Sequence, residues 1–370
     1  MQSLAIFKIK PTVSYHFING CTYFSISGTA LEMSDPKKFI FSLCNLFDGK
    51  RNLQQIEEIL KKDYIQEVSY LNDAINALDS IYVLENVLVN IPSQELTKYD
   101  VDRWSRNVEF FSAYCNANTN KYSLQEKLKN IKVTLLGVGG LGSHLLYDLS
   151  ALGVYNIRAV DFDKIELSNL NRQILYAEED VGETKIMAAQ KRIGKFFPNN
   201  KFEFIDKKLE SIADVEDIIK GSDIVICVAD KPRLEMQKWL NQACVNLKIP
   251  FITGGLDLKR AVLCTIIPHL SGCIECWKKS LESKQDLAFK LLQSETQLAP
   301  TQIPMPAVVP LVSTLVGLML SEFTKFVTNI SKMQSLGKLL AFNFDECSIT
   351  ESEAWGIHSD CKVCGNGAKL

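Results

Sequence analysis

The chain lacks the features that would tie it to nucleic acid, to a membrane or to the outside of the cell. Its formal net charge is only −2, so no excess of one sign attracts nucleic acid or anionic lipid. Its longest apolar run, residues 307–320, is too short to span a bilayer and predicts a buried helix. The first residues contain neither a long apolar stretch nor a small-residue cleavage site. We therefore expect a cytoplasmic protein without nucleic-acid or membrane partners.

Cysteine, by contrast, is abundant, with 11 residues. Because there is no secretion signal, these residues favour thiols and metal ligands over disulfides. Four of them form two C-x-x-C pairs, Cys273 with Cys276 and Cys361 with Cys364. Four thiolates suit a structural Zn²⁺ ion, which would clip the C-terminal segment onto its domain. Four buried free thiols are the alternative.

The length of 370 residues predicts two domains. Residues 1–95 predict a small α+β domain of winged-helix type, and residues 96–130 predict a polar connector with helical stretches. In the first domain, strands are expected at 22–27 and 82–89, helices at 36–47, 53–62 and 67–80, and a turn at Asp48-Gly49.

Residues 131–370 predict an α/β domain of Rossmann type with a mostly parallel sheet, because strand and helix patterns alternate. The polar segment 285–305 predicts a loop that crosses the domain. Strands are expected at 131–136, 157–161, 202–205, 224–228, 251–253, 263–267 and 339–344, and helices at 142–152, 186–197, 215–220 and 234–247.

A glycine-rich turn joins the first strand of this domain to its first helix. The motif G-x-G-x-x-G allows a tight turn and close backbone approach, and it presents free helix N–H groups to an anion. Asp161, at the end of the next strand, suits the ribose hydroxyls of NAD or ATP, and Asp163 follows it. A turn that binds nothing is the alternative. The glycines of the turn are Gly137, Gly139, Gly140 and Gly142.

Further along, Asn169, Arg172 and Lys185 add an amide and two cations, and Asp230 follows an apolar strand. Fixed cations stabilise the charge that develops when pyrophosphate leaves a triphosphate. A carboxylate at a strand end suits Mg²⁺. This set favours ATP over a redox cofactor, although any single charge could be a solvated surface group.

The motifs GVGGLG, DFDKIELSNLNRQ and VGETK, followed by an Asp after an apolar strand, resemble the MoeB/ThiF and ubiquitin-activating adenylation family. The resemblance covers residues 103–364 and implies that the chain activates a carboxylate with ATP. It also implies that the domain carries a zinc clip. By this resemblance Asp161 holds the ribose, the phosphates lie on Asn169, Arg172 and Lys185, and Asp230 positions Mg²⁺.

Residues 103–106, with sequence RWSR, resemble the family's R-Y-x-R-Q segment. The resemblance implies that Arg106 reaches the ATP site of a neighbouring subunit, and hence a homodimer. The chain departs from the family where an Asp-Asn pair is replaced by Asp230-Lys231. Ubiquitin-type enzymes transfer the acyl group to a cysteine, but residues 277–346 contain none. We therefore expect no enzyme thioester. Three other cysteines lie in apolar segments and are expected in the core: Cys227, Cys244 and Cys264.

The segment FSLCNLFDGKRNLQQIEEIL resembles the signature of PqqD-like domains, which recognise leader peptides of ribosomal peptide pathways. These domains bind a leader as an added strand at a sheet edge, here expected near residues 23–27. A leader-binding domain before an adenylation domain resembles the layout of the peptide-modifying enzymes of microcin C and pantocin A type. The resemblance therefore implies adenylation of a precursor peptide, held through its leader.

Four alternatives remain open. The chain could adenylate the C-terminal glycine of a sulfur-carrier protein, or it could be a non-catalytic scaffold that presents a leader peptide. Its first domain could serve only dimerisation or packing. An NAD oxidoreductase is the least favoured, because NAD does not need this set of cations.

Overall fold

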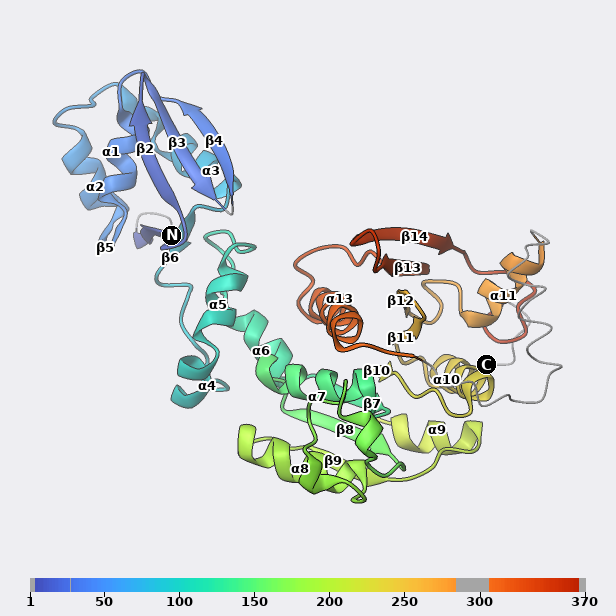
Figure 1. The fold of residues 1–370 in the computed structure, drawn as a ribbon. Helices are drawn as coiled ribbons and strands as arrows, with labels where there is room; N and C mark the ends of the chain where they lie inside the picture. The colour runs from blue at the N-terminus through green and yellow to red at the C-terminus, as the bar shows by residue number, and fades with distance from the viewer. Residues whose placement is uncertain (1–3, 27, 284–305, 366–370) are drawn as a thin grey trace. The chain divides into compact units, whose positions relative to one another are not determined.

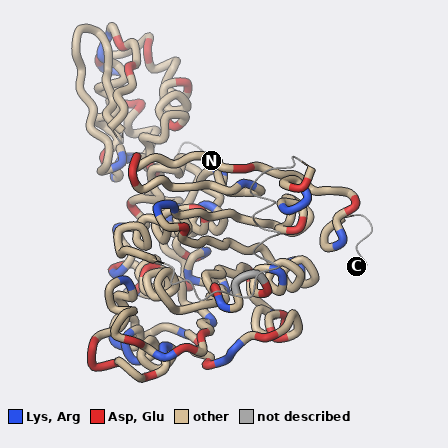
Figure 2. Tube along the Cα trace, turned by 45° about the vertical axis from the view of Figure 1, so that its right-hand side comes forward, with Lys and Arg blue, Asp and Glu red and all other residues tan. Residues whose placement is uncertain are grey.

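The computed structural model describes residues 4–26, 28–283 and 306–365 (Figure 1). The chain divides into two compact units, residues 1–127 and 128–370. The predicted crossing loop at 285–305 lies outside the described residues. Lys and Arg are interspersed with Asp and Glu along both units (Figure 2).

The first unit contains two small antiparallel sheets and a set of helices. One sheet has the strand order β2-β3-β4 and the other β5-β1-β6. The strands are β1 (Ile6–Ile9), β2 (Ser14–Ile18), β3 (Cys21–Ile26), β4 (Thr29–Ser34), β5 (Asp48–Asn52) and β6 (Leu84–Asn86). The helices are α1 (Phe39–Leu46), α2 (Leu53–Leu60) and α3 (Leu71–Ser80), with a 3-10 turn (Glu67–Tyr70) before α3.

Local sequence explains where these helices begin and which side they bury. The Asn52 side chain accepts a hydrogen bond from the N–H of Gln55, and the Gln55 side chain accepts one from the N–H of Asn52, so a capping box starts α2. Leu53, Ile56 and Leu60 recur at helical spacing and are buried. The small core of the unit includes Phe24, Leu43, Ile56 and Leu78, all fully buried.

Two expectations for the first unit need correction. The Asp48-Gly49 segment has turn geometry, because the Asp48 side chain accepts the N–H groups of Lys50 and Arg51. It nevertheless pairs with β1 and forms the irregular strand β5. The segment at residues 82–89 contains only the short strand β6. The remaining helices here are α4 (Lys98–Arg103), α5 (Ser105–Ser112) and α6 (Tyr122–Asn130), and the last of these ends in the second unit.

The second unit is built on one eight-stranded sheet with the order β14-β13-β12-β11-β10-β7-β8-β9. Strands β11, β10, β7, β8 and β9 run parallel, whereas β12, β13 and β14 pair antiparallel. The strands are β7 (Lys132–Leu136), β8 (Asn156–Asp161), β9 (Glu203–Asp206), β10 (Ile224–Cys227), β11 (Phe251–Asp257), β12 (Arg260–Ile266), β13 (Lys338–Asn343) and β14 (Ser348–Ala354). The predicted mostly parallel α/β fold is confirmed.

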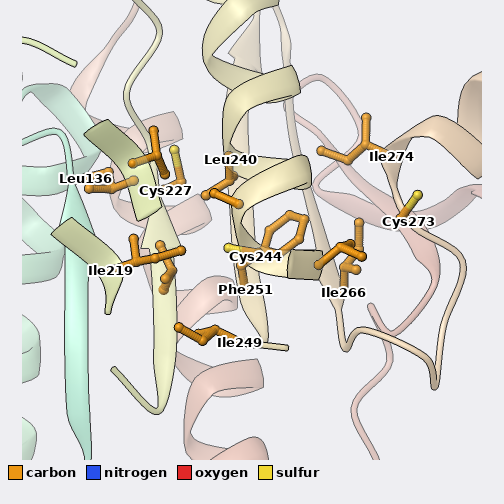
Figure 3. Close-up of a cluster of buried hydrophobic side chains, with 14 of the residues drawn as sticks. Leu136, Ile219, Cys227, Leu240, Cys244, Ile249, Phe251, Ile266, Cys273 and Ile274 are labelled. Atoms are coloured by element: carbon orange, nitrogen blue, oxygen red, sulfur yellow. The ribbon is translucent and has the colours of Figure 1, made fainter. Parts of the chain in front are cut away.

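Helices cover both faces of this sheet, with α7, α8 and α13 on one side and α9, α10 and α11 on the other (Figure 1). Apolar side chains from the strands meet those of α10, where Leu240 and Cys244 face Phe251 (Figure 3). The helices are α7 (Gly140–Leu152), α8 (Lys185–Phe196), α9 (Ile212–Ile219), α10 (Arg233–Leu247), α11 (Ile274–Ser283) and α13 (Val309–Thr328).

Helix α13 extends beyond the 14-residue apolar run, residues 307–320, from which a buried helix was predicted. At 20 residues it is long and apolar enough to cross a membrane, and half of its most apolar window is buried. It packs against α7, β11 and β12, and Leu315, Val316 and Met319 are inaccessible to solvent. These are the contacts of a core helix, as expected from the sequence.

Candidate nucleotide-binding site

The glycine turn after β7 can be built only with glycine at two positions. Gly137 has a φ of +91°, and a Cβ there would lie 2.9 Å from the backbone nitrogen of Ala229. A Cβ on Gly142 would lie 1.9 Å from the carbonyl oxygen of Gly137. These contacts let α7 start directly against the turn. Its N-cap residue, Gly139, supplies no side-chain cap, so the first N–H groups can bind an anion.

Asp161 is fixed at the end of β8 beside this turn. Its Oδ2 accepts the N–H of Val138 at 2.7 Å, and its Oδ1 accepts the N–H of Asp163 at 2.8 Å. Burial raises the pKa of Asp161, while Lys185 and the two N–H groups oppose that rise. The carboxylate is therefore held in one orientation, as an acceptor for ribose hydroxyls must be.

Lys185 is the first residue of α8, and it is buried beside the carboxylates of Asp161 and Asp163. Its Nζ lies 2.8 Å from Asp163 Oδ2 and 3.8 Å from Asp161 Oδ1. The Thr184 side chain accepts the N–H of Met187 and so fixes the start of the helix. A Cβ on Gly139 would lie 3.7 Å from Lys185 Nζ, which places the ammonium against the glycine turn.

Arg172 lies against the same turn from the other direction. A Cβ on Gly140 would lie 3.4 Å from its Nε. Its Nη1 donates to the Asn171 side chain at 2.8 Å and to the Ser168 carbonyl at 3.3 Å. His144 Nε2 lies 3.0 Å from the Arg172 carbonyl oxygen, so this histidine of α7 holds the backbone in place. The two predicted cations are thus brought together at the glycine turn.

Asn169 has a structural contact as well. Its Oδ1 accepts the N–H of Glu166 at 3.2 Å, and in the described part of the chain no hydrogen bond uses its NH₂ group. Gln173, which sequence reasoning missed, is only 3% exposed, and its Oε1 has no hydrogen-bond partner among the described residues. A Cβ on Gly139 would lie 3.8 Å from Gln173 Nε2. Gln173 could have been identified from the sequence, because it directly follows Arg172 in the motif DFDKIELSNLNRQ.

Asp230 lies exposed just beyond β10, next to the strand that carries the glycine turn. Its neighbour Lys231 extends to Asp163, with Nζ 3.4 Å from Oδ2. Arg106 is exposed on α5 in the first unit. The roles expected for Asp230 and Arg106 therefore stay predictions, as do those of the other site residues.

A cavity of about 470 Å³ is lined by Phe162, the residue that follows Asp161 in the chain. Aromatic and apolar groups line much of it, which suits a flat heterocycle such as a nucleotide base. Only Phe162 and Lys231 stand in motifs quoted above; the lining comes from four places, directly after β8, after β9, between β10 and α10, and within α10. The lining residues are Phe162, Lys208, Leu209, Glu210, Lys231, Pro232 and Trp239.

The four C-x-x-C cysteines form one buried cluster, with all four Sγ atoms within 4.8 Å of one another. The Sγ atoms are 3.9 Å apart for Cys273 and Cys276, 3.7 Å for Cys273 and Cys361, and 3.3 Å for Cys276 and Cys364. A Zn–S bond of about 2.3 Å in a tetrahedron requires about 3.8 Å between sulfurs, so the cluster could hold zinc. The backbone N–H of His358 donates to Cys276 Sγ at 3.4 Å, as a thiolate ligand needs.

Three further cysteines are buried among apolar groups, as predicted. Burial raises the pKa of Cys227 and of Cys264 to about 12 and the pKa of Cys244 well above its usual range. These thiols stay protonated at neutral pH and are poor nucleophiles.

A model of the ThiF family matches residues 105–363. The chain belongs to the ThiF family. It is 27% identical over 243 residues to the molybdopterin-synthase adenylyltransferase of Escherichia coli, which covers 65% of this chain and 90% of that protein. It is 33% identical over 169 residues to the NEDD8-activating enzyme E1 catalytic subunit of Saccharomyces cerevisiae. That match covers 42% of this chain and only 54% of the yeast subunit. Both relatives are thus named as enzymes that adenylate or activate, and use of ATP by this chain is a proposal that family membership supports.

Solved structures resemble the whole chain. The structure of E. coli MccB with ATP has a TM-score of 0.77 at 25% identity and covers 97% of this chain and 99% of that one. PaaA has a TM-score of 0.73 at 20% identity and covers 94% of this chain and all of that one, a likeness of fold alone. Both likenesses extend over most of the first unit of the ThiF-family chain as well as the second.

Proposed function

We propose that this protein is an adenylyltransferase that activates a carboxylate, or an amide-derived oxygen, on a short ribosomally made precursor peptide. The observation that carries the proposal is the whole-length likeness to MccB. A related structure is described as the microcin C7 biosynthetic enzyme MccB in complex with N-formylated MccA. By contrast, the match to the E. coli molybdopterin-synthase adenylyltransferase covers 90% of that enzyme but only 65% of this chain. The ThiF family model begins at residue 105, so most of the first unit lies outside it and is available for a different substrate.

In the proposed reaction a substrate oxygen attacks the α-phosphorus of ATP, and the bond from that phosphorus to the pyrophosphate oxygen breaks. The base lies in the cavity beside Phe162 and Trp239, and the ribose hydroxyls donate to Asp161. The N-terminus of α7 and the cations Arg172 and Lys185 face the phosphates, where they stabilise the negative charge that develops on pyrophosphate. Asn169 and Gln173 offer amide N–H groups to the same phosphate oxygens.

Asp230 is the residue proposed to hold Mg²⁺ at this site. Its exposed carboxylate follows a parallel strand, in the place where hard cations bind beside phosphates. Bound there, the ion would supply positive charge to the phosphate oxygens. The zinc cluster has no open position in this proposal and serves stability alone.

The first unit is proposed to bind the leader of the peptide as an added strand. The expected groove at residues 23–27 needs correction, because β3 is the central strand of its sheet and its backbone is paired on both sides. An added strand can pair only with an edge, here β2 or β4. Binding at such an edge would raise the effective concentration of the peptide's reactive end at the nucleotide site.

After adenylation, the acyl group is proposed to pass directly to a nucleophile of the substrate, such as a neighbouring backbone N–H. The buried cysteines of the core remain protonated, as their raised pKa values require. The one exposed cysteine among the described residues, Cys347, lies in the turn between β13 and β14. A thioester on the enzyme is therefore not part of the proposal.

The second candidate substrate is the C-terminal glycine of a sulfur-carrier protein, which the match to the molybdopterin-synthase adenylyltransferase favours. The test incubates the protein with Mg²⁺ and ATP and measures AMP and pyrophosphate. One arm contains synthetic peptides encoded by short reading frames beside the gene, and the other a carrier protein ending in Gly-Gly. Release that depends on a peptide supports the proposal, and release that depends only on the carrier replaces it. ATP binding without turnover in either arm favours a non-catalytic scaffold.

A further inference from the structure

Lys231 has no counterpart in the family pattern quoted above, which has Asn at this position. It follows Asp230 at the end of β10 and lines the 470 Å³ cavity. Its Nζ lies 3.4 Å from Oδ2 of Asp163, a residue that follows β8. Strand β7 lies between β10 and β8 in the sheet. The Lys231 side chain therefore reaches across the carboxyl end of β7, where the glycine turn begins.

Two lysines share the carboxylate of Asp163, and they are held very differently. Lys185 Nζ lies 2.8 Å from Oδ2, and its side chain is 7% exposed. Lys231 contacts the same oxygen at 3.4 Å with a side chain that is 67% exposed. An exposed ion pair of this kind contributes little to stability, so Lys231 can exchange its partner at little cost. Lys185 keeps Asp163 paired when Lys231 leaves.

We propose that Lys231 moves its ammonium group from Asp163 to the β- and γ-phosphates when ATP binds. The inference rests on the proposed nucleotide site and adds a third cation to it. A triphosphate placed between Asp161 and the glycine turn lies within the span that Lys231 already bridges. The amide of Asn, the family residue, could donate a hydrogen bond there but would supply no charge to the departing pyrophosphate.

The test is calorimetric binding of two nucleotides, the ATP analogue AMPCPP with Mg²⁺ and AMP. AMPCPP carries the β- and γ-phosphates but does not release pyrophosphate, whereas AMP lacks them. Lys231→Met should weaken AMPCPP binding roughly tenfold, the effect of one charge-assisted hydrogen bond. AMP binding should change by less than about twofold, and Lys231→Arg should retain most of the AMPCPP affinity.

Lys259→Met is the matched control, because the Lys259 side chain is 65% exposed and pairs with Asp345, and Lys259 is not among the residues that line the cavity. It should leave AMPCPP binding unchanged. Unchanged AMPCPP binding in Lys231→Met, or an equal loss for AMP, would overturn the inference. A wild-type protein that binds AMPCPP but releases no pyrophosphate with any peptide would contradict the proposed function alone. A wild-type protein that binds neither nucleotide would contradict both.

Discussion

Arg172 is positioned by contacts that leave the rest of its guanidinium for a ligand. It donates to Asn171 and Ser168 through one nitrogen, Nη1, and its Nε faces Gly140. We expect Arg172→Ala to lower peptide-dependent pyrophosphate release about 100-fold or more, because its charge acts on the transition state. The matched control is Arg260→Ala, since Arg260 is exposed and paired with Asp257 at the far end of β11 and β12. Equal activity of the two variants would contradict the role of Arg172.

The ion pairs of Asp163 should make a pH-dependent contribution to the free energy of unfolding. Burial raises its pKa, but the hydrogen bond and charge of Lys185, and then of Lys231, bring the pKa below the ordinary value of 3.8. The folded state therefore binds this proton less tightly than the unfolded state. The stability that Asp163 contributes is present above about pH 4 and is lost as the pH falls through the lowered pKa.

Urea unfolding of the wild type and of Asp163→Asn between pH 7 and pH 3 measures this contribution. The free energy of unfolding should be lower in the variant at pH 7, and the difference should shrink below about pH 4. A difference that stays constant over this range would show that the Lys185 pair does not stabilise the fold.

At the scale of elements, the start of α7 depends on the close approach of Gly142 to Gly137. An added methyl group at Gly142 would meet the Gly137 carbonyl at 1.9 Å, so Gly142→Ala should cost about 3 kcal/mol or more in the free energy of unfolding. Gly194→Ala is the control, because a Cβ there meets nothing within 4 Å inside α8. It should raise the free energy of unfolding by about 0.5–1 kcal/mol. Similar values for both variants would refute the packing argument.

The cysteine cluster connects the start of α11 to the C-terminal segment. Metal analysis of the purified protein should find about one zinc per chain, and Cys276→Ser should remove most of it and lower Tm. Cys347→Ser, at an exposed cysteine outside the cluster, should change neither quantity. Wild-type protein without bound metal would show that the four residues are buried free thiols.

Much of the second unit could be predicted from the sequence because its central strands are mostly apolar and largely buried. Strand β10 is a continuous apolar run, and β7 is mostly apolar and buried from Val133 onward; they end just before Gly137 and near Asp230, which makes both their type and their ends visible. Strand β14, with sequence SITESEA, was missed because it is a mostly exposed edge strand without an apolar run. Strands β1, β2 and β4 of the first unit were missed as well.

The residues proposed to hold the phosphates could be named from the sequence, whereas most of those that line the cavity could not. The glycines, the amide and the two cations proposed for the phosphates stand in one stretch from Gly137 to Lys185, so a pattern along the chain indicates them together. The cavity residues Phe162, Leu209 and Trp239 come from three separate parts of the chain and meet only in the folded domain. Their types are also those of ordinary core residues, so spacing along the chain carries no signal.

At the scale of the whole molecule, the proposed homodimer gives Arg106 a role in the site of a partner subunit. Arg106→Ala and Arg172→Ala should each abolish activity alone. After unfolding and refolding of a 1:1 mixture, half of the dimers contain one of each, and one of their two sites is intact. Activity should recover to about a quarter of the wild-type value. The control is to show that the refolded mixture contains mixed dimers of the two variants. If these mixed dimers are inactive, Arg106 does not act in the partner's site.

The central claim is that this ThiF-family protein forms an acyl-adenylate on a peptide. Exchange of labelled pyrophosphate into ATP measures this step directly, because only a reversible adenylation returns the label to the β- and γ-phosphates. We predict exchange that requires Mg²⁺ and the precursor peptide, and that Arg172→Ala abolishes. Release of ADP and phosphate without any exchange, in the presence of the same peptide, would contradict the account.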